Sequence, residues 1–135
     1  MTSLVLDAEA LSSLARGSRH EATVRAALTA ALSENAEVLV PAAALSECYR
    51  GPRHDPAIDG CLSREGGIGV VSTDRSLARR VGHLLASAGW GSEHHVDATV
   101  AATCATAGGG VILTTDTSDL APAGSDIVVR GLARR

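Results

Sequence analysis

Four acidic residues stand at positions that solvation alone does not explain. Asp7 follows the apolar run SLVL, and Asp116 comes shortly after the apolar run VIL. Glu47 and Asp97 lie among alanine, valine and leucine residues, where acids are rarely placed without a partner. If the two apolar runs form neighbouring parallel strands, Asp7 and Asp116 meet at the sheet edge where α/β proteins carry their active sites.

Carboxylates gathered at one edge repel one another, and proton uptake or a bound cation relieves the repulsion. Oxygen ligands without cysteine or histidine favour a hard ion such as Mg²⁺ or Mn²⁺. One or two such ions activate a water molecule, align it with a phosphodiester and neutralise charge on the leaving oxygen. The four acids therefore point to metal-dependent phosphodiester hydrolysis.

Each acid also has an ordinary structural interpretation. Asp7 could cap the helix that follows it, and Asp116 could bond its own backbone in a turn. Asp97 could sit in the first turn of a helix, where the helix dipole favours a carboxylate. Glu47 could pair with an arginine such as Arg50. It is the combination of the four that favours a site.

Length and composition predict one folded domain. The chain has 135 residues, of which 45% are hydrophobic and 20% charged, so we expect residues 1–135 to form a single globular domain. No apolar run approaches the roughly 18 residues of a membrane span, and the N-terminus lacks a signal-peptide pattern. We therefore expect a cytoplasmic protein without membrane association.

The charge balance limits how the chain could hold nucleic acid. The formal net charge is −3 and lysine is absent, so all of the positive charge is arginine. A protein that held nucleic acid by bulk electrostatics alone would be basic. A nucleic-acid role therefore requires a local site or bound metal ions. The odd number of widely spaced cysteines, Cys48, Cys61 and Cys104, favours buried thiols over disulfides or a zinc site.

Short β-rich runs alternate with helical patterns along the chain. Strands are expected at Ser3–Leu6, Val38–Val40, Gly69–Ser72, Val111–Leu113 and Ile127–Val129. Helices are expected before Gly17 and over residues 20–33, 42–50, 74–88 and 96–107. Residues 52–66 read as a loop-rich stretch with one helical turn near 57–62. This alternation predicts an α/β fold with a parallel sheet between helices on both faces.

The order of the motifs resembles the PIN-domain family, and within it the VapC-type ribonuclease toxins of toxin–antitoxin pairs. The motifs are LVLDAEAL, VPAAALSECYRG, VDATVAA and VILTTDTSDL, and the similarity spans nearly the whole chain. The resemblance implies a three-layer α/β/α architecture with a short, mostly parallel sheet of four to five strands. It also implies a cognate antitoxin partner whose segment covers the acidic pocket, an RNA substrate and a homodimer.

For the site, the resemblance implies an endoribonuclease dependent on Mg²⁺ or Mn²⁺. The residues that it assigns to catalysis and metal binding are Asp7, Glu47, Asp97 and Asp116, with Asp119 as a fifth acid at the metal site and Thr114 as a supporting hydroxyl. The chain departs from the family pattern at Glu9, where many relatives carry a small polar residue. This extra acid could tune the metal site or point to solvent.

Several weaker candidates have equally ordinary explanations. Arg16, Arg19, Arg50 and Arg53 could grip RNA phosphates or form a solvated surface. The adjacent His94 and His95 are expected to be solvated, and Trp90 is expected to pack at a helix end.

Two other functions compete with the nuclease. A phosphoacceptor signalling domain also gathers acids and Mg²⁺ at the strand ends of a parallel sheet, but such domains rely on a lysine that this chain lacks. The alternative that we keep is a catalytically weak PIN-like module that binds RNA or protein.

Overall fold

A parallel β-sheet forms the centre of the computed structural model, which describes residues 2–18, 20–114 and 127–131. The strands are β1 (Ser3–Leu6), β2 (Glu37–Pro41), β3 (Ile68–Val71), β4 (Gly110–Thr114) and β5 (Ile127–Gly131). They lie in the order β3-β2-β1-β4-β5, and every neighbouring pair is parallel. The predicted strands and their parallel arrangement are confirmed, and β1 and β4 are indeed neighbours.

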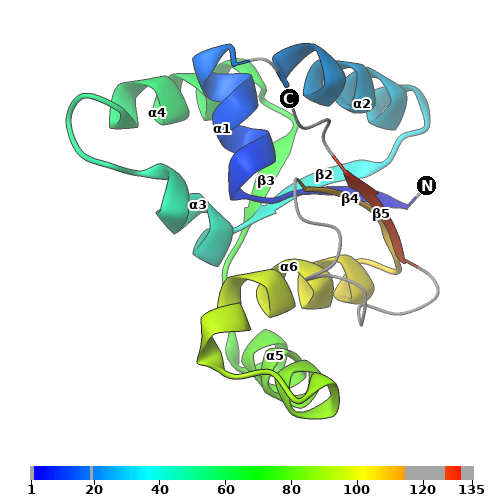
Figure 1. Cartoon of the computed structure of the whole chain (residues 1–135). Coiled ribbons are helices and arrows are strands. Elements are labelled where there is room, and N and C mark those ends of the chain that lie inside the picture. Colours follow the sequence, from blue (N-terminus) through cyan, green and yellow to red (C-terminus); the bar gives the residue numbers. More distant parts are fainter. Residues whose placement is uncertain (1, 19, 115–126, 132–135) are drawn as a thin grey trace.

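Helices cover both faces of this sheet (Figure 1). They are α1 (Ala8–Arg16), α2 (Glu21–Ser33), α3 (Ala42–Cys48), α4 (Asp55–Arg64), α5 (Arg75–Ala88), the short 3₁₀ helix η1 (Ser92–His94) and α6 (His95–Thr106). Figure 1 shows α1, α2 and α4 on one side of the sheet and α5 and α6 on the other. The structure therefore has the predicted three-layer α/β/α architecture. Of the described helices, none combines the length and apolar character that a membrane crossing requires.

The core lies around the two central strands. Leu4, Val5 and Leu6 of β1 and Ile112 of β4 are fully buried. A continuous apolar run of this kind is typical of a parallel strand that is covered on both faces. The fully buried Leu11 of α1 belongs to the same cluster. Burial thus holds β1 and β4 in place, and Asp7 directly follows the carboxyl end of β1.

Close contact between β1 and β4 depends on a glycine. Gly110 has a φ of 147°, and a Cβ added there would collide with the Ser3 carbonyl oxygen. The Ser3 hydroxyl also donates a hydrogen bond of 2.9 Å to the Gly109 carbonyl oxygen. These contacts hold the starts of the two strands in register, so that their carboxyl ends, Leu6 and Leu113, are paired as well.

The segment 52–66 is more helical than the sequence analysis predicts. Helix α4 has ten residues instead of a single turn, with a proline in its first turn and Ile58 and Cys61 buried. Only those two side chains of α4 are buried, so the apolar periodicity in the sequence is weak. The first expected helix is confirmed to end at Gly17, and the three cysteines are confirmed as buried free thiols.

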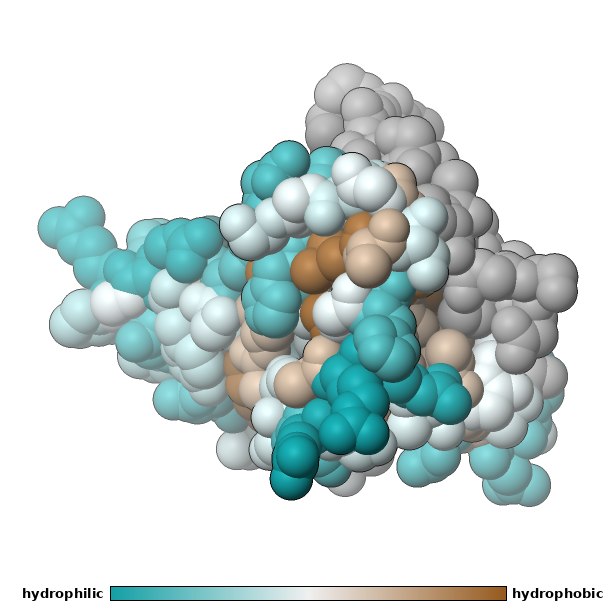
Figure 2. All heavy atoms as spheres, turned by 90° about the horizontal axis from the view of Figure 1, so that it is seen from below, coloured by the Kyte–Doolittle hydropathy of each residue, from teal (hydrophilic) through white to brown (hydrophobic). Residues whose placement is uncertain are grey.

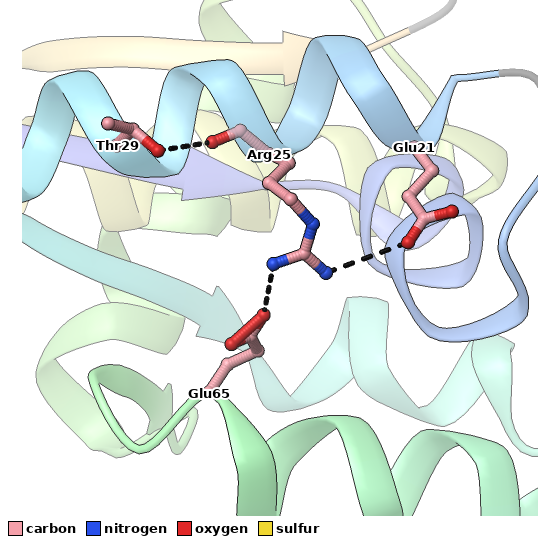
Figure 3. Close-up of polar contacts among 4 residues, drawn as sticks. All are labelled: Glu21, Arg25, Thr29 and Glu65. Carbon is pink, nitrogen blue, oxygen red and sulfur yellow. Dashed lines mark hydrogen bonds and ion pairs between the residues drawn. The ribbon is translucent and has the colours of Figure 1, made fainter.

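A small ion-pair network ties the end of α4 to α2 (Figure 3). Arg25 Nη1 donates to Glu65 Oε1 at 2.8 Å, and Arg25 Nη2 lies 3.6 Å from Glu21 Oε1. The Arg25 side chain is 48% exposed, so solvent screens these pairs and we expect them to contribute little to stability. Glu65 is the C-cap of α4, just before the turn into β3, which is an edge strand separated from β4 by β2 and β1.

Helices α5 and α6 form the face seen in Figure 2. The outer side of α5 carries Arg79, Arg80 and His83, which are all exposed. Figure 2 shows a hydrophilic ridge across this face with apolar surface beside it. Leu77 and Val81 attach the other side of α5 to α6 in a second small apolar cluster that includes Trp90. The prediction that Trp90 packs at a helix end is confirmed.

Candidate active site

A polar hollow of about 310 Å³ opens at the carboxyl ends of β1 and β4. Its described lining is Asp7, Ala8, Glu9, Ser12, Glu47, Arg50, Val96, Asp97 and Thr114. We call it the acidic hollow. Three of the four predicted catalytic acids and the predicted supporting hydroxyl line it, although they come from four separate segments. The other predicted acids, Asp116 and Asp119, lie outside the described residues.

Asp7 lies where β1 passes into α1. It is the N-cap of α1, and its Oδ1 accepts a hydrogen bond of 2.8 Å from the Ala10 amide. The capping interpretation is therefore correct, but the same carboxylate also lines the acidic hollow. Both roles follow from one position, because the residue that ends a central strand here also begins a helix.

The electrostatic setting of Asp7 disfavours its charge. Burial raises the pKa of the Asp7 carboxyl, and the negative charge of Glu9 acts in the same direction. Hydrogen bonds from the Thr114 hydroxyl and from the Ala10 amide oppose this by lowering the pKa. The net direction is upward. A cation in the acidic hollow would relieve this cost, because opposite charge favours the ionised form.

Glu47 and Asp97 reach the acidic hollow from two different helices, α3 and α6. Glu47 is exposed on α3, whose buried residues are Ala44 and Cys48. Asp97 is in the first turn of α6, where the helix dipole favours a carboxylate, as the structural interpretation of this residue expects. Its side chain is 37% exposed. Helices α3 and α6 contact each other, and this contact brings the two acids to one hollow.

The sequence analysis is wrong in treating His94 as a solvated residue. The His94 ring stacks on Trp90, with centroids 4.7 Å apart, and is only 28% exposed. Its Nδ1 atom lies 4.0 Å from Asp97 Oδ2. His95 is exposed, as predicted. Adjacent residues at the start of a helix point in different directions, so one histidine can be packed while the other is exposed. The stacking of His94 on Trp90 decides which one is packed.

The donor atoms of the acidic hollow suit a hard cation. The described lining offers carboxylates and hydroxyl groups, with no thiol or imidazole, which is the ligand set that Mg²⁺ and Mn²⁺ prefer. Within the described part of the chain, no three acidic, histidine or cysteine side chains lie close enough together to hold one ion. The acids are therefore arranged around the hollow from several sides. Glu9 is exposed and adds a further carboxylate to the rim.

Comparisons with known proteins agree with this architecture. The PIN domain family profile matches residues 4–121. One similar solved structure is VapBC2 from Rickettsia felis bound to a promoter DNA fragment, with a TM-score of 0.69, 12% identity and coverage of 95% of this chain and 97% of that one. Another is DNA-bound VapBC from Salmonella typhimurium, with a TM-score of 0.67, 16% identity and coverage of 98% and 100%. No curated protein sequence matches the chain. The profile covers most of the chain, which therefore belongs to the PIN domain family.

Proposed function

We propose that this protein is an endoribonuclease dependent on Mg²⁺ or Mn²⁺ and that it is the toxin of a toxin–antitoxin pair. The observation that carries the proposal is the convergence of Asp7, Glu47 and Asp97 on one hollow at the carboxyl ends of the central strands. Membership of the PIN domain family supports a nuclease, because proteins of this family are generally nucleases. In this proposal residues 1–135 act as one domain.

The proposed metal ligands are three acids of the hollow, without Glu9, together with two acids that follow β4 in the sequence. They are Asp7, Glu47, Asp97, Asp116 and Asp119. A bound divalent ion supplies an activated water molecule and neutralises charge at the phosphodiester. The protein contributes position: α1 and β1 fix Asp7, and the Thr114 hydroxyl orients its carboxylate by a hydrogen bond. Because burial raises the pKa of Asp7, a cation beside it would favour the ionised form of this carboxylate.

The partner proposals come from the structural neighbours and the resemblance. The two similar structures are both VapBC complexes, which supports an antitoxin as the partner of this chain. We propose that an antitoxin segment covers the acidic hollow, that the toxin acts as a homodimer and that it works on RNA in the cytoplasm.

A binding-only module is the second candidate. It is favoured by the spacing of the described acids, since no three of them lie close enough to hold one ion. Such a module would bind RNA or protein through the same hollow without cutting. The two candidates differ in one measurable property, which is metal-dependent cleavage.

The test is cleavage of total cellular RNA by purified protein in Mg²⁺, in Mn²⁺ and in chelator. Asp7→Asn is the inactive variant, and Asp74→Asn is the matched control, since Asp74 caps α5 as Asp7 caps α1. We expect discrete products that need metal, that disappear with Asp7→Asn and that persist with Asp74→Asn. Cleavage that survives Asp7→Asn contradicts the assigned site. RNA binding without cleavage by antitoxin-free protein in either metal supports the binding module instead.

A further inference from the structure

Arg50 carries the only positive charge among the described residues that line the acidic hollow. Four carboxylates, those of Asp7, Glu9, Glu47 and Asp97, share that lining. Within the described part of the chain, however, no ion pair of 4.0 Å or less joins Arg50 to any acid. Arg50 is exposed, and its Nη1 donates to the Tyr49 carbonyl oxygen at 2.9 Å. The guanidinium thus stays near the acids without being neutralised by them.

The backbone that places Arg50 is held by one side chain. Oδ1 of Asp55, the first residue of α4, accepts hydrogen bonds of 3.0 Å from the Arg50 amide and of 3.0 Å from the Gly51 amide. Gly51 takes a φ of 102°, which lets both amides point at one oxygen. The His54 and Asp55 amides close the turn by donating to the Gly51 carbonyl oxygen at 2.9 Å each.

A second contact fixes the same turn from outside. The Tyr49 hydroxyl donates a hydrogen bond of 2.6 Å to Asp59 Oδ1, one turn further along α4. The link between α3 and α4 is therefore braced on both sides of Arg50. An exposed arginine on a mobile loop would lose side-chain and backbone entropy on binding an anion, whereas this backbone is already ordered.

We propose that Arg50 binds a phosphate group of the RNA strand that enters the acidic hollow, and that Asp55 positions it. This inference rests on the proposed ribonuclease function. A guanidinium binds a phosphate through two parallel hydrogen bonds, and most N–H donors of Arg50 remain available for that contact. The arginine also offsets the repulsion between the RNA backbone and the acids around it, which bulk charge cannot do in a protein of net charge −3.

Binding of a fluorescent single-stranded oligoribonucleotide to Asp7→Asn protein tests the assignment without relying on cleavage. Fluorescence anisotropy is measured in Mg²⁺ at several salt concentrations. Adding Arg50→Ala should weaken binding about tenfold at low salt. It should also lower the slope of log affinity against log salt by about 0.7, the value for one phosphate contact on a single strand. Arg50→Lys should keep the slope and recover only part of the affinity.

Arg53→Ala is the matched control, because Arg53 is exposed in the same turn and is not among the described residues of the hollow. It should change neither the affinity nor the slope as Arg50→Ala does. Asp55→Ala should reproduce the Arg50→Ala defect, whereas Asp55→Asn keeps the oxygen acceptor and should rescue binding. The rescue separates a positioning role from a general loss of structure.

The outcomes distinguish this inference from the function on which it rests. If Asp7→Asn protein binds RNA and Arg50→Ala leaves affinity and slope unchanged, the assignment of Arg50 is wrong while the nuclease proposal stands. Equal defects in Arg50→Ala and Arg53→Ala indicate bulk charge and also overturn it. If Asp7→Asn protein binds no RNA and wild-type protein cleaves none, the proposed function itself fails.

Discussion

Removing the charge of Asp7 should stabilise the protein while abolishing the proposed nuclease activity. Asp7 and Asp74 cap two helices with nearly the same geometry: φ and ψ are −79° and −179° at Asp7, and −80° and −178° at Asp74. Each Oδ1 accepts a bond of 2.8 Å from the amide three residues later. They differ in environment, since Asp7 is half-buried in the acidic hollow and Asp74 is exposed. Comparing variants of Asp7 and Asp74 therefore separates the stability contributed by a helix cap from the stability lost by burying a charge.

The expected magnitudes follow from this difference. Loss of an aspartate cap costs about 1 kcal/mol, which corresponds to roughly 3 to 5 °C in Tm for a domain of this size. Asp74→Ala should show the full loss. Asp7→Ala should show less, because it also removes a carboxylate whose pKa is raised by burial. Asp7→Asn keeps the capping oxygen and removes the charge, so its Tm should exceed that of the wild type at neutral pH.

The pH dependence has a definite sign. Because the pKa of Asp7 is raised in the folded state, its contribution to stability is greatest below the unfolded value of 3.8 and is lost as the pH rises through the folded value. The stabilising effect of Asp7→Asn should therefore be largest at neutral pH and should shrink as the pH falls toward 3.8.

Thermal unfolding in chelator, followed by circular dichroism, measures all four variants, which are Asp7→Asn, Asp7→Ala, Asp74→Asn and Asp74→Ala. Chelator is needed because a divalent ion bound to the native state stabilises it by mass action. Equal losses in the two alanine variants would refute the argument that burial makes Asp7 costly. An Asp7→Asn protein less stable than the wild type at neutral pH would refute it as well.

Two further predictions concern the scaffold. Gly110→Ala should lower the free energy of unfolding by about 1 to 3 kcal/mol or more, because the added Cβ would collide with the Ser3 carbonyl oxygen. Gly82→Ala on α5, where nothing lies within 4 Å, should raise it by up to about 1 kcal/mol, and urea unfolding of both variants checks this pair. The pKa of Tyr49 is raised to about 12 by its hydrogen bond to Asp59, so ultraviolet titration of this single tyrosine should give a midpoint near 12. Asp59→Asn should lower that midpoint toward the ordinary value of 10.0, whereas an unchanged midpoint would contradict the cause assigned to it.

The strands and most helices could be predicted because their signals are local. Apolar runs that end at a polar residue mark β1 and β4, and Gly17 ends α1 as expected. The pairing of β1 with β4 has no such local signal, because the two strands are more than a hundred residues apart in the sequence. The sequence supports it only through the acids that it would bring together.

The features that could not be predicted depend on packing. Only Ile58 and Cys61 of α4 are buried, so its periodicity barely differs from that of a polar loop. His94 becomes half-buried because Trp90 provides a ring to stack on, and nothing in the adjacent pair of histidines indicates which of them does so. The placement of Arg50 requires a turn closed by Asp55, a contact between side chain and backbone that has no periodic signal.

Asp7 and Asp74 also show where function enters this fold. The local sequence gives both residues the same backbone angles and the same hydrogen bond, so local structure cannot distinguish them. Asp7 differs because it ends a central strand beside β4, whose last residue Thr114 donates a hydrogen bond to it, and because α3 and α6 bring Glu47 and Asp97 to the same hollow. Asp74 follows the edge strand β3 and meets no other acid of that group. The helix cap keeps the carboxylate in place without a metal, and the order of the strands gives it partners. Under the proposed function, the described part of the site is therefore ordered before a metal ion or RNA binds.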